Sequence, residues 1–273
     1  MEHLSNDSSG FNIEHILTNW PFDPHSINVR LLKNAAREVL QMRVDMGILQ
    51  LETDGRPDGK RPNGESTYYD FLKAAAIENK EFVLQEQDCV EIDREFVQYY
   101  HRRICWLQLK EFDRAVSDAD HTLGLMDFCK QFSQDEEWTI SHEQYRPFVL
   151  YHRTQAAALA ALNAEVADSA QSAIDEVDLG LEEIRSLFEQ YNAGDQFEGD
   201  ELVQRLVEFR DGLRDKFELG ESMDVLESKL KEAIDSEDYE AAAELRDKIA
   251  EIKNQTDLVL DEMDELGLDI DEF

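Results

Sequence analysis

Proline is distributed unevenly along this 273-residue chain, and this distribution limits the fold more than any other feature. Four of the five prolines lie within residues 21–62, and Pro147 is the only proline after Tyr68. Proline removes a backbone hydrogen-bond donor and interrupts helix interiors, so long helices are expected only in the second region. The sequence therefore predicts a mainly α protein with a small non-helical unit near its start.

The non-helical unit is expected over residues 20–66, after a polar and disordered segment at residues 1–19. Apolar residues alternate with polar ones at Ile27, Val29 and Leu31, and again over residues 40–48. Such a period of two indicates strands. The phase then shifts through Leu49 and Leu51, which predicts a bulge or turn beside Gly47. We expect a two- or three-stranded antiparallel unit that closes with a loop rich in glycine and proline.

Helix-forming residues dominate the rest of the chain. Helices are predicted over residues 67–79, 81–109, 112–130, 142–162, 166–191, 200–218, 222–235 and 238–254. Residues 192–200 hold two glycines and three acids and predict a linker or long turn.

A repeat is predicted inside the helical region at residues 67–191. The positions that match are Tyr99, Trp106, Phe112, Ala115, Val116 and Leu123, and departures occur at Arg103, Thr122 and Asp127. This segment is similar to a tetratricopeptide repeat (TPR). A weaker second copy would place Ala157 and Ala161 on one helix and Ala173, Val177, Gly180 and Leu181 on the next. The resemblance implies a TPR-like array of helical hairpins, and an ordinary antiparallel bundle is the alternative.

The most specific motif is LESKLKEAIDSEDYEAAAELRDKIAEI at residues 226–252. It resembles the UVR motif, a helical hairpin shared by the UvrB and UvrC excision-repair subunits, Clp-type ATPases and a bacterial protein-arginine kinase activator. The matching positions are Leu226, Leu230, Ala233, Tyr239, Glu240, Ala242, Ala243, Leu245, Arg246, Asp247 and Ile249. The resemblance implies that a helical segment over residues 200–255 ends in a UVR hairpin at 222–255 that contacts another protein through these residues.

The spacing of the apolar residues agrees with a hairpin. Each predicted helix carries one apolar stripe at three- and four-residue steps, and Asp238 is expected to cap the second helix. A hairpin of this size cannot bury its stripes completely, so an apolar edge is expected to remain available to a partner. In the alternative interpretation the stripes pack on the upstream helices and Arg246 pairs with a local carboxylate.

Net charge narrows the choice of partner. The chain has 62 acidic and 27 basic residues and a formal charge of −35. Phosphate backbones and anionic lipids bind proteins mainly through Lys and Arg, so direct nucleic-acid and membrane binding are disfavoured. The acidity fits either solubility, as in a salt-adapted host, or attraction to a basic partner. With no signal peptide or membrane span in the sequence, the expected location is the cytoplasm.

We find no sequence template for an enzyme or a cofactor site. Walker, GxGxxG, GxSxG and HExxH motifs are missing, and the three cysteines and seven histidines do not have metal-ligand spacing. We expect neither catalytic residues, nor a metal, nor another cofactor.

Two segments allow more than one interpretation. The loop DGRPDGKRPNG at residues 54–64 could bind an anion through Arg56, Lys60 and Arg61, or it could be a surface turn whose basic side chains pair with the acidic body. The acidic, partly apolar tail at 256–273 could fold onto a basic apolar groove or stay solvated.

These observations favour a protein-protein interaction adaptor or scaffold, whose partner would be a UVR-bearing protein or a Clp-type or Uvr-type machine. One alternative is an accessory factor of nucleotide excision repair or of Clp-type proteolysis. Another is a regulator or enzyme that uses the basic loop.

We predict no measurable binding to duplex DNA at physiological salt, because the excess negative charge opposes association with phosphates. Fluorescence anisotropy of a labelled duplex measures this directly. Submicromolar affinity that falls steeply with salt would contradict the prediction.

Overall fold

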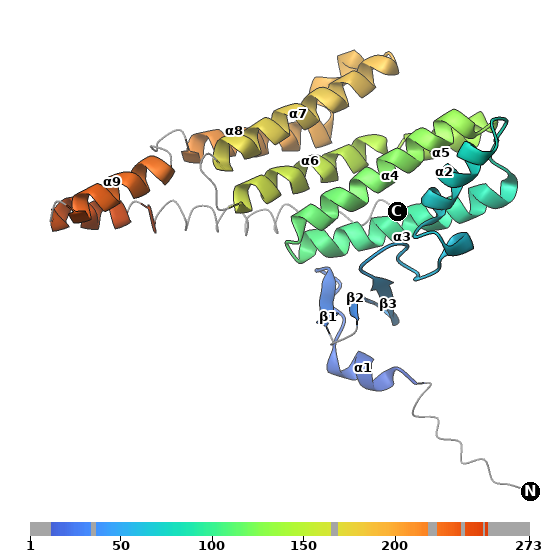
Figure 1. Ribbon diagram of the computed structural model, residues 1–273, viewed down its shortest axis with the longest axis horizontal. Coiled ribbons are helices and arrows are strands. Elements are labelled where there is room, and N and C mark those ends of the chain that lie inside the picture. The colour runs from blue at the N-terminus through green and yellow to red at the C-terminus, as the bar shows by residue number, and fades with distance from the viewer. Residues whose placement is uncertain are drawn as a thin grey trace, which may run out of the picture. The chain divides into compact units, whose positions relative to one another are not determined.

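The computed structural model describes residues 12–33, 37–164, 169–217, 223–235, 238–247 and 249–250. They fall into two compact units, which divide between Lys110 and Glu111. Within these ranges the chain is mainly helical, and its strands form a three-stranded antiparallel sheet near the N-terminus (Figure 1). The expected fold class is confirmed. None of the described helices combines the length and the apolar character that crossing a membrane requires.

The sheet of the first unit has the order β1-β2-β3. The strands are β1 (Asn28–Lys33), β2 (Glu38–Val44) and β3 (Gly47–Glu52). Val44 pairs with Gly47, so Asp45 and Met46 form a two-residue turn between β2 and β3. The predicted turn beside Gly47 is confirmed, and the alternating pattern over residues 40–48 is divided by it between the two strands. Met46 continues the sequence alternation, but it lies in the turn and is 86% exposed.

One face of the sheet is apolar. Cross-strand pairing brings together Val29, Leu31, Leu40, Met42, Leu49 and Leu51. Side chains of paired residues share a face, and Leu40, Met42 and Leu51 are buried. Strand β2 contacts helix α3 (Glu86–Gln108), so the sheet and this helix belong to one packed unit.

The opposite face carries a polar ladder across all three strands. The Arg30 guanidinium donates to Gln41 Oε1 at 2.6 and 2.9 Å, and Gln41 Nε2 donates to Gln50 Oε1 at 2.9 Å. The Trp20 ring lies 4.2 Å from the Arg30 guanidinium. This cation–π contact attaches the segment before β1 to the sheet.

A short helix, α1 (Glu14–Asn19), precedes Trp20, in contrast to the disorder expected over residues 1–19. Asn12 Oδ1 accepts a hydrogen bond from the Glu14 backbone N–H at 2.8 Å, a local turn that favours helix initiation. Residues 1–11 lie outside the described residues.

Side-chain caps set where the helices of the first unit begin. Helix α2 is Tyr68–Glu78, and Thr67 Oγ1 accepts from the Asp70 backbone N–H at 3.0 Å. Helix α3 begins at Glu86 and not at residue 81, because Gln85 and Asp88 form a capping box at that point.

The second unit contains a succession of helices. These are α4 (Phe112–Phe132), α5 (Glu136–Glu143), α6 (Arg146–Asn163), α7 (Ser169–Gln190), η3 (Gly194–Gly199), α8 (Glu201–Phe217) and α9 (Met223–Asp235). The sequence did not predict α5, which is capped by the Asp135 side chain and ends before Pro147. Pro147 occupies the first turn of α6, where its missing N–H costs nothing. The predicted linker at 192–200 contains a short 3-10 helix, η3, with Phe197 buried.

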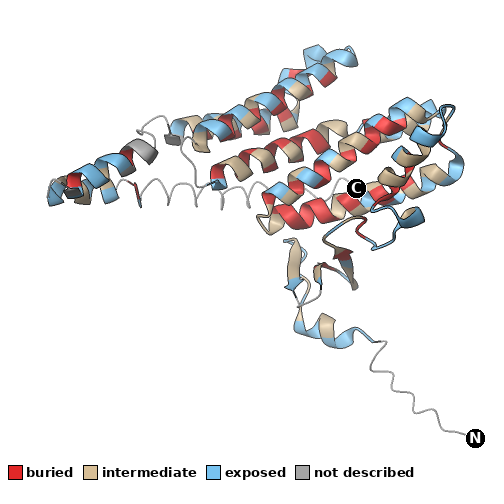
Figure 2. Ribbon diagram, in the orientation of Figure 1, coloured by how far each residue is buried: buried red, intermediate tan, exposed pale blue. Residues whose placement is uncertain are grey.

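Helix α6 is central to this unit, since it contacts α4, α7 and α8. Buried residues line α4 and α6 (Figure 2). At the contact between α6 and α7, a Cβ added to Gly180 would lie 1.9 Å from Thr154 Oγ1. Glycine at this position therefore permits the close approach of the two helices.

The TPR-like repeats stay predictions. The helices of the second predicted copy, α6 and α7, do pack together, and Ala173, Val177, Gly180 and Leu181 are buried. Ala157 and Ala161, by contrast, are half-buried. The first predicted copy, at residues 99–127, spans the division between the two units.

We predict that Gly180→Ala lowers the free energy of unfolding by about 1–3 kcal/mol, since the methyl group must displace Thr154 in a packed contact. Gly212→Ala in α8 is the matched control, because a Cβ there meets no atom within 4 Å. Alanine favours helix over glycine, so the control should be neutral or stabilising. Denaturant unfolding of both variants measures the difference, and equal effects would contradict the close contact.

Candidate functional site

The C-terminal hairpin is built from α9 and a second helical stretch at residues 239–247 and 249–250. Between them, the Asp238 backbone N–H donates to the Ala233 carbonyl at 2.9 Å. Asp238 Oδ1 accepts from the Ala241 backbone N–H at 3.2 Å. The predicted cap at Asp238 is confirmed, and it fixes the start of the second helix.

The hairpin has a thin apolar core. Leu226, Ala233 and Ile249 are buried, at 0%, 8% and 8% exposure. The remaining predicted apolar positions, Leu230, Ala242, Ala243 and Leu245, are half-buried. The side chains of the two predicted stripes are thus only partly buried, as expected for so small a unit.

Several of the predicted contact residues are exposed. Tyr239 is 72% exposed, and Glu240 is exposed beside it. Arg246 Nη2 lies 3.0 Å from Asp247 Oδ1, with both side chains more than two-thirds exposed. An exposed ion pair of this kind contributes little to stability. The sequence analysis missed Ile234, whose apolar side chain is 53% exposed. Its position directly after Ala233, the last residue of the Leu226–Leu230–Ala233 stripe, could have indicated it.

Comparison with known families identifies this hairpin. The UvrB/uvrC motif (UVR) matches residues 220–255. The match is confined to the C-terminal part of the chain. Neither the search of curated proteins nor the search of solved structures found a match. The comparison therefore supports a UVR motif in the C-terminal hairpin. It covers none of the upstream helices, whose function has to be argued from their structure.

The second predicted site, the loop at 54–64, is fixed by backbone contacts. The Arg56 backbone N–H donates to the Ser66 carbonyl at 2.9 Å. Arg102 of α3 donates from Nη1 to the carbonyls of Gly55, at 2.8 Å, and Glu52, at 3.0 Å. Gly55 has a φ of +64°, and a Cβ there would lie 2.9 Å from the Ser66 carbonyl oxygen. This glycine allows the two ends of the loop to meet.

Arg56 lies inside the unit and not on its surface. Its side chain is 1% exposed and its Nη2 lies 2.8 Å from Glu91 Oε2. Its Nε lies 3.5 Å from Glu95 Oε2, and Glu95 is completely buried. The expected pairing with acidic side chains of the body is confirmed for this residue, but its expected position on the surface is wrong, because two carboxylates of α3 hold its guanidinium inside the unit.

Glu95 also holds the start of α2. Its Oε2 accepts from the Tyr68 backbone N–H at 2.7 Å, and its Oε1 accepts from the Tyr69 N–H at 3.0 Å. These are two of the N-terminal donors that a helix leaves unpaired. The buried carboxylate thus receives two backbone donors and one cation.

Hydrogen bonds and burial shift the pKa values of two members of this network. The hydrogen bond from Arg56 lowers the pKa of Glu91 below its ordinary value. Burial, followed by the hydrogen bond to Asp88, raises the pKa of the Tyr68 hydroxyl above its ordinary value. Both groups therefore keep their usual ionisation state at neutral pH.

The other two basic residues of the loop face outward. Lys60 is mostly exposed and lies 3.7 Å from Asp58, and Arg61 is exposed. They border a polar pocket of about 460 Å³, which Arg56 and Arg37 also line while paired with Glu91 and Glu52, respectively. The anion-binding interpretation thus keeps Lys60 and Arg61 but loses Arg56 to internal carboxylates.

No group of three or more His, Cys, Asp or Glu side chains suited to a metal lies together in the described part of the chain.

We predict that Arg56→Gln lowers the free energy of unfolding by about 3–5 kcal/mol, because it leaves the buried carboxylate of Glu95 without its cation. The double variant Lys60→Gln/Arg61→Gln is the control and should change stability by less than about 0.5 kcal/mol. Denaturant unfolding compares them. A small effect of Arg56→Gln would show that the network is dispensable.

Proposed function

We propose that this protein is a non-catalytic adaptor whose UVR hairpin recruits another protein. The observation that carries the proposal is the match of the UVR motif to a hairpin with a thin core and exposed apolar side chains. Tyr239 and Ile234 offer apolar surface that a partner can cover. Arg246 and Asp247 add exposed charges. Each can leave the ion pair between them and pair with a charged residue of the partner.

The partner that the motif favours is a second UVR-bearing protein or a Uvr-type or Clp-type machine. Two paired hairpins would bury the apolar edge that each leaves exposed alone. This is a protein contact and requires no nucleic acid.

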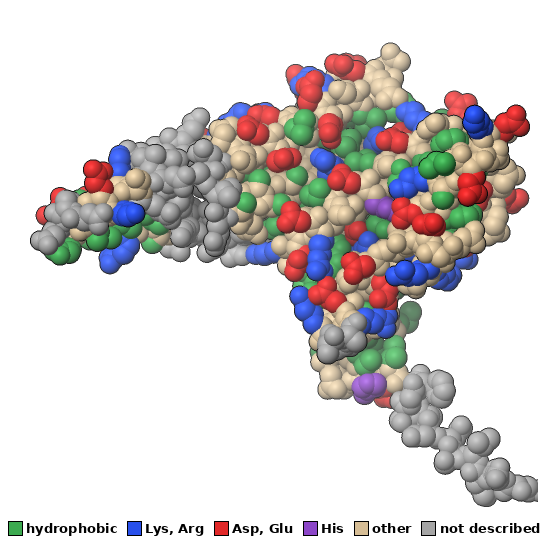
Figure 3. Space-filling view, viewed as in Figure 1, with side chains coloured by type: hydrophobic (Ala, Val, Ile, Leu, Met, Phe, Trp, Pro, Cys, Tyr) green, Lys and Arg blue, Asp and Glu red, His purple; other side chains and the backbone are tan. Residues whose placement is uncertain are grey.

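The rival functions have weaker support. A repair factor that touches DNA directly would have to overcome a formal charge of −35. Acidic and basic side chains are interspersed on the face shown in Figure 3. A regulator acting through the loop at 54–64 would lack Arg56, which is engaged by Glu91.

We predict that Leu245→Asp weakens binding to the UVR partner at least tenfold while far-ultraviolet circular dichroism stays nearly unchanged. A carboxylate in the half-buried stripe disfavours closure of the hairpin, which is a local event at the end of the chain. Binding is measured against purified, immobilised UvrB-type and Clp-type proteins of the same organism.

The exposed neighbour Glu244 supplies the control. Glu244→Gln should bind like the wild type. Global loss of helicity in Leu245→Asp would place the hairpin in the main core and remove the basis of the adaptor proposal. Unchanged binding would exclude the hairpin as the contact.

A further inference from the structure

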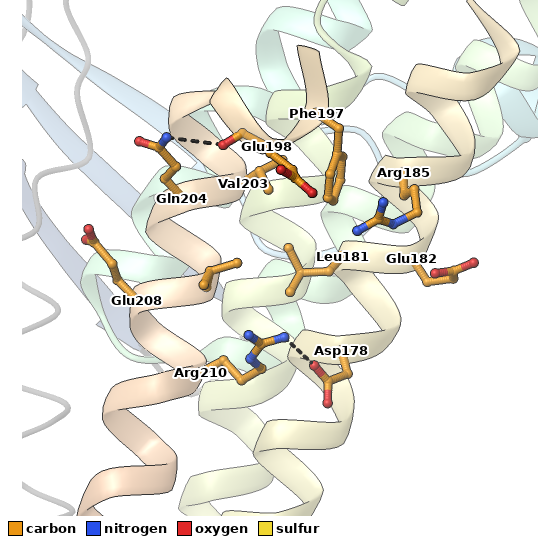
Figure 4. A pocket seen from close by; sticks show the side chains of 11 residues that line it. Asp178, Leu181, Glu182, Arg185, Phe197, Glu198, Val203, Gln204, Glu208 and Arg210 are labelled. Carbon is orange, nitrogen blue, oxygen red and sulfur yellow. Dashed lines mark hydrogen bonds and ion pairs between the residues drawn. The ribbon is translucent and has the colours of Figure 1, made fainter. Parts of the chain in front are cut away.

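A groove of about 630 Å³ lies between α7, η3 and α8 of the second unit (Figure 4). Its floor is apolar and comes from all three elements: Leu181, Phe197, Val203 and Val207. The first three are buried and belong to the fold, whereas Val207 is half-buried. The volume is within the range of pockets that take a ligand or several side chains of a partner.

The two arginines of the groove already have partners. The Arg185 guanidinium lies 4.1 Å from the centre of the Phe197 ring. Arg210 Nη1 lies 3.0 Å from Asp178 Oδ1, and Figure 4 shows this pair at the end of the groove away from Phe197. The charge of Arg210 is therefore balanced by Asp178, whereas Arg185 keeps its charge and is held beside the Phe197 ring.

Three carboxylates of the groove have no such partner. Glu182, Glu198 and Glu208 are exposed on α7, η3 and α8, respectively. Among the described residues their carboxylates make no ion pair or hydrogen bond. An apolar floor is thus bordered by negative charges from three separate elements.

This arrangement favours a ligand that carries positive charges at the edges of an apolar surface. An amphipathic helix fits it, because its apolar residues at three- and four-residue steps can lie along the floor between α7 and α8. Lysines on its flanks would reach the carboxylates while their methylene stems contact the apolar wall. The chain's own tail at 256–273 has eight acids and no base, so like charge opposes its binding there.

We propose that the α7–η3–α8 groove binds a basic amphipathic helix of a protein partner. This inference deepens the proposed adaptor function by assigning a second docking surface, separate from the UVR hairpin. The two surfaces would let the protein hold two partners at once.

The probe for the test is a fluorescein-labelled peptide of about 14 residues, roughly four helical turns, made of leucine and lysine with one apolar stripe. A peptide of the same composition, scrambled so that the stripe is lost, controls for attraction by charge alone. Fluorescence anisotropy at physiological salt should show at least tenfold tighter binding of the striped peptide.

Two variants of the full chain locate the site. Glu182→Gln/Glu198→Gln/Glu208→Gln removes the three carboxylates, and Val207→Lys places a cation on the floor. Each should weaken binding of the striped peptide about tenfold. The matched control is Glu65→Gln/Glu78→Gln/Glu81→Gln, which removes the same charge from exposed positions of the first unit and should change affinity less than twofold.

The remaining outcomes of the binding experiment would overturn the groove proposal or separate it from the UVR proposal. Equal losses in the two triple variants would show unspecific attraction to an acidic protein and overturn the proposal. A tenfold gain in affinity on removal of residues 256–273 would make the tail the occupant and also overturn it. Leu245→Asp should bind the peptide like the wild type, so a failure of the UVR proposal and a failure of the groove proposal are told apart.

Discussion

The buried carboxylate of Glu95 joins three segments of the first unit. It accepts the backbone N–H groups of Tyr68 and Tyr69 at the start of α2, and it lies 3.5 Å from the Arg56 guanidinium. A buried charge without such partners would be costly, so α2, α3 and the loop at 54–64 have to adopt their positions together. A segment whose glycines and prolines indicate a loose turn is for this reason held in one conformation, with Gly55 at positive φ.

Features set by neighbouring residues were predictable from the sequence. The Asp238 cap and the turn beside Gly47 depend on residues a few positions apart, and both occur as expected. The helix missed by prediction shows where local reasoning stops. Pro147 was compatible with a helix beginning earlier, but the Asp135 cap starts a separate helix, α5, and Pro147 starts the next.

The burial of Arg56 could not be predicted in the same way, because the α3 carboxylates that surround it, Glu91 and Glu95, lie more than thirty positions away along the chain. Composition alone places a basic residue in a polar loop on the surface. A signal was nevertheless present: Glu91, Glu95 and Arg102 follow one another at helical spacing on the same face of α3 as buried Tyr99. Charges on the buried stripe of a helix require an opposite charge from another segment, and the loop supplies it.

The excess of acidic residues and the proposed groove would act over different distances. Charge spread over the surface attracts a basic partner from beyond contact range and raises the association rate, an effect that salt screens. It does not distinguish one basic peptide from another. The apolar floor of the groove acts only at contact, where half-buried Val207 and the edges of the buried residues beneath it favour a partner with a matching apolar stripe and slow its dissociation. A partner therefore needs both properties, a positive charge to arrive quickly and helical amphipathicity to remain bound.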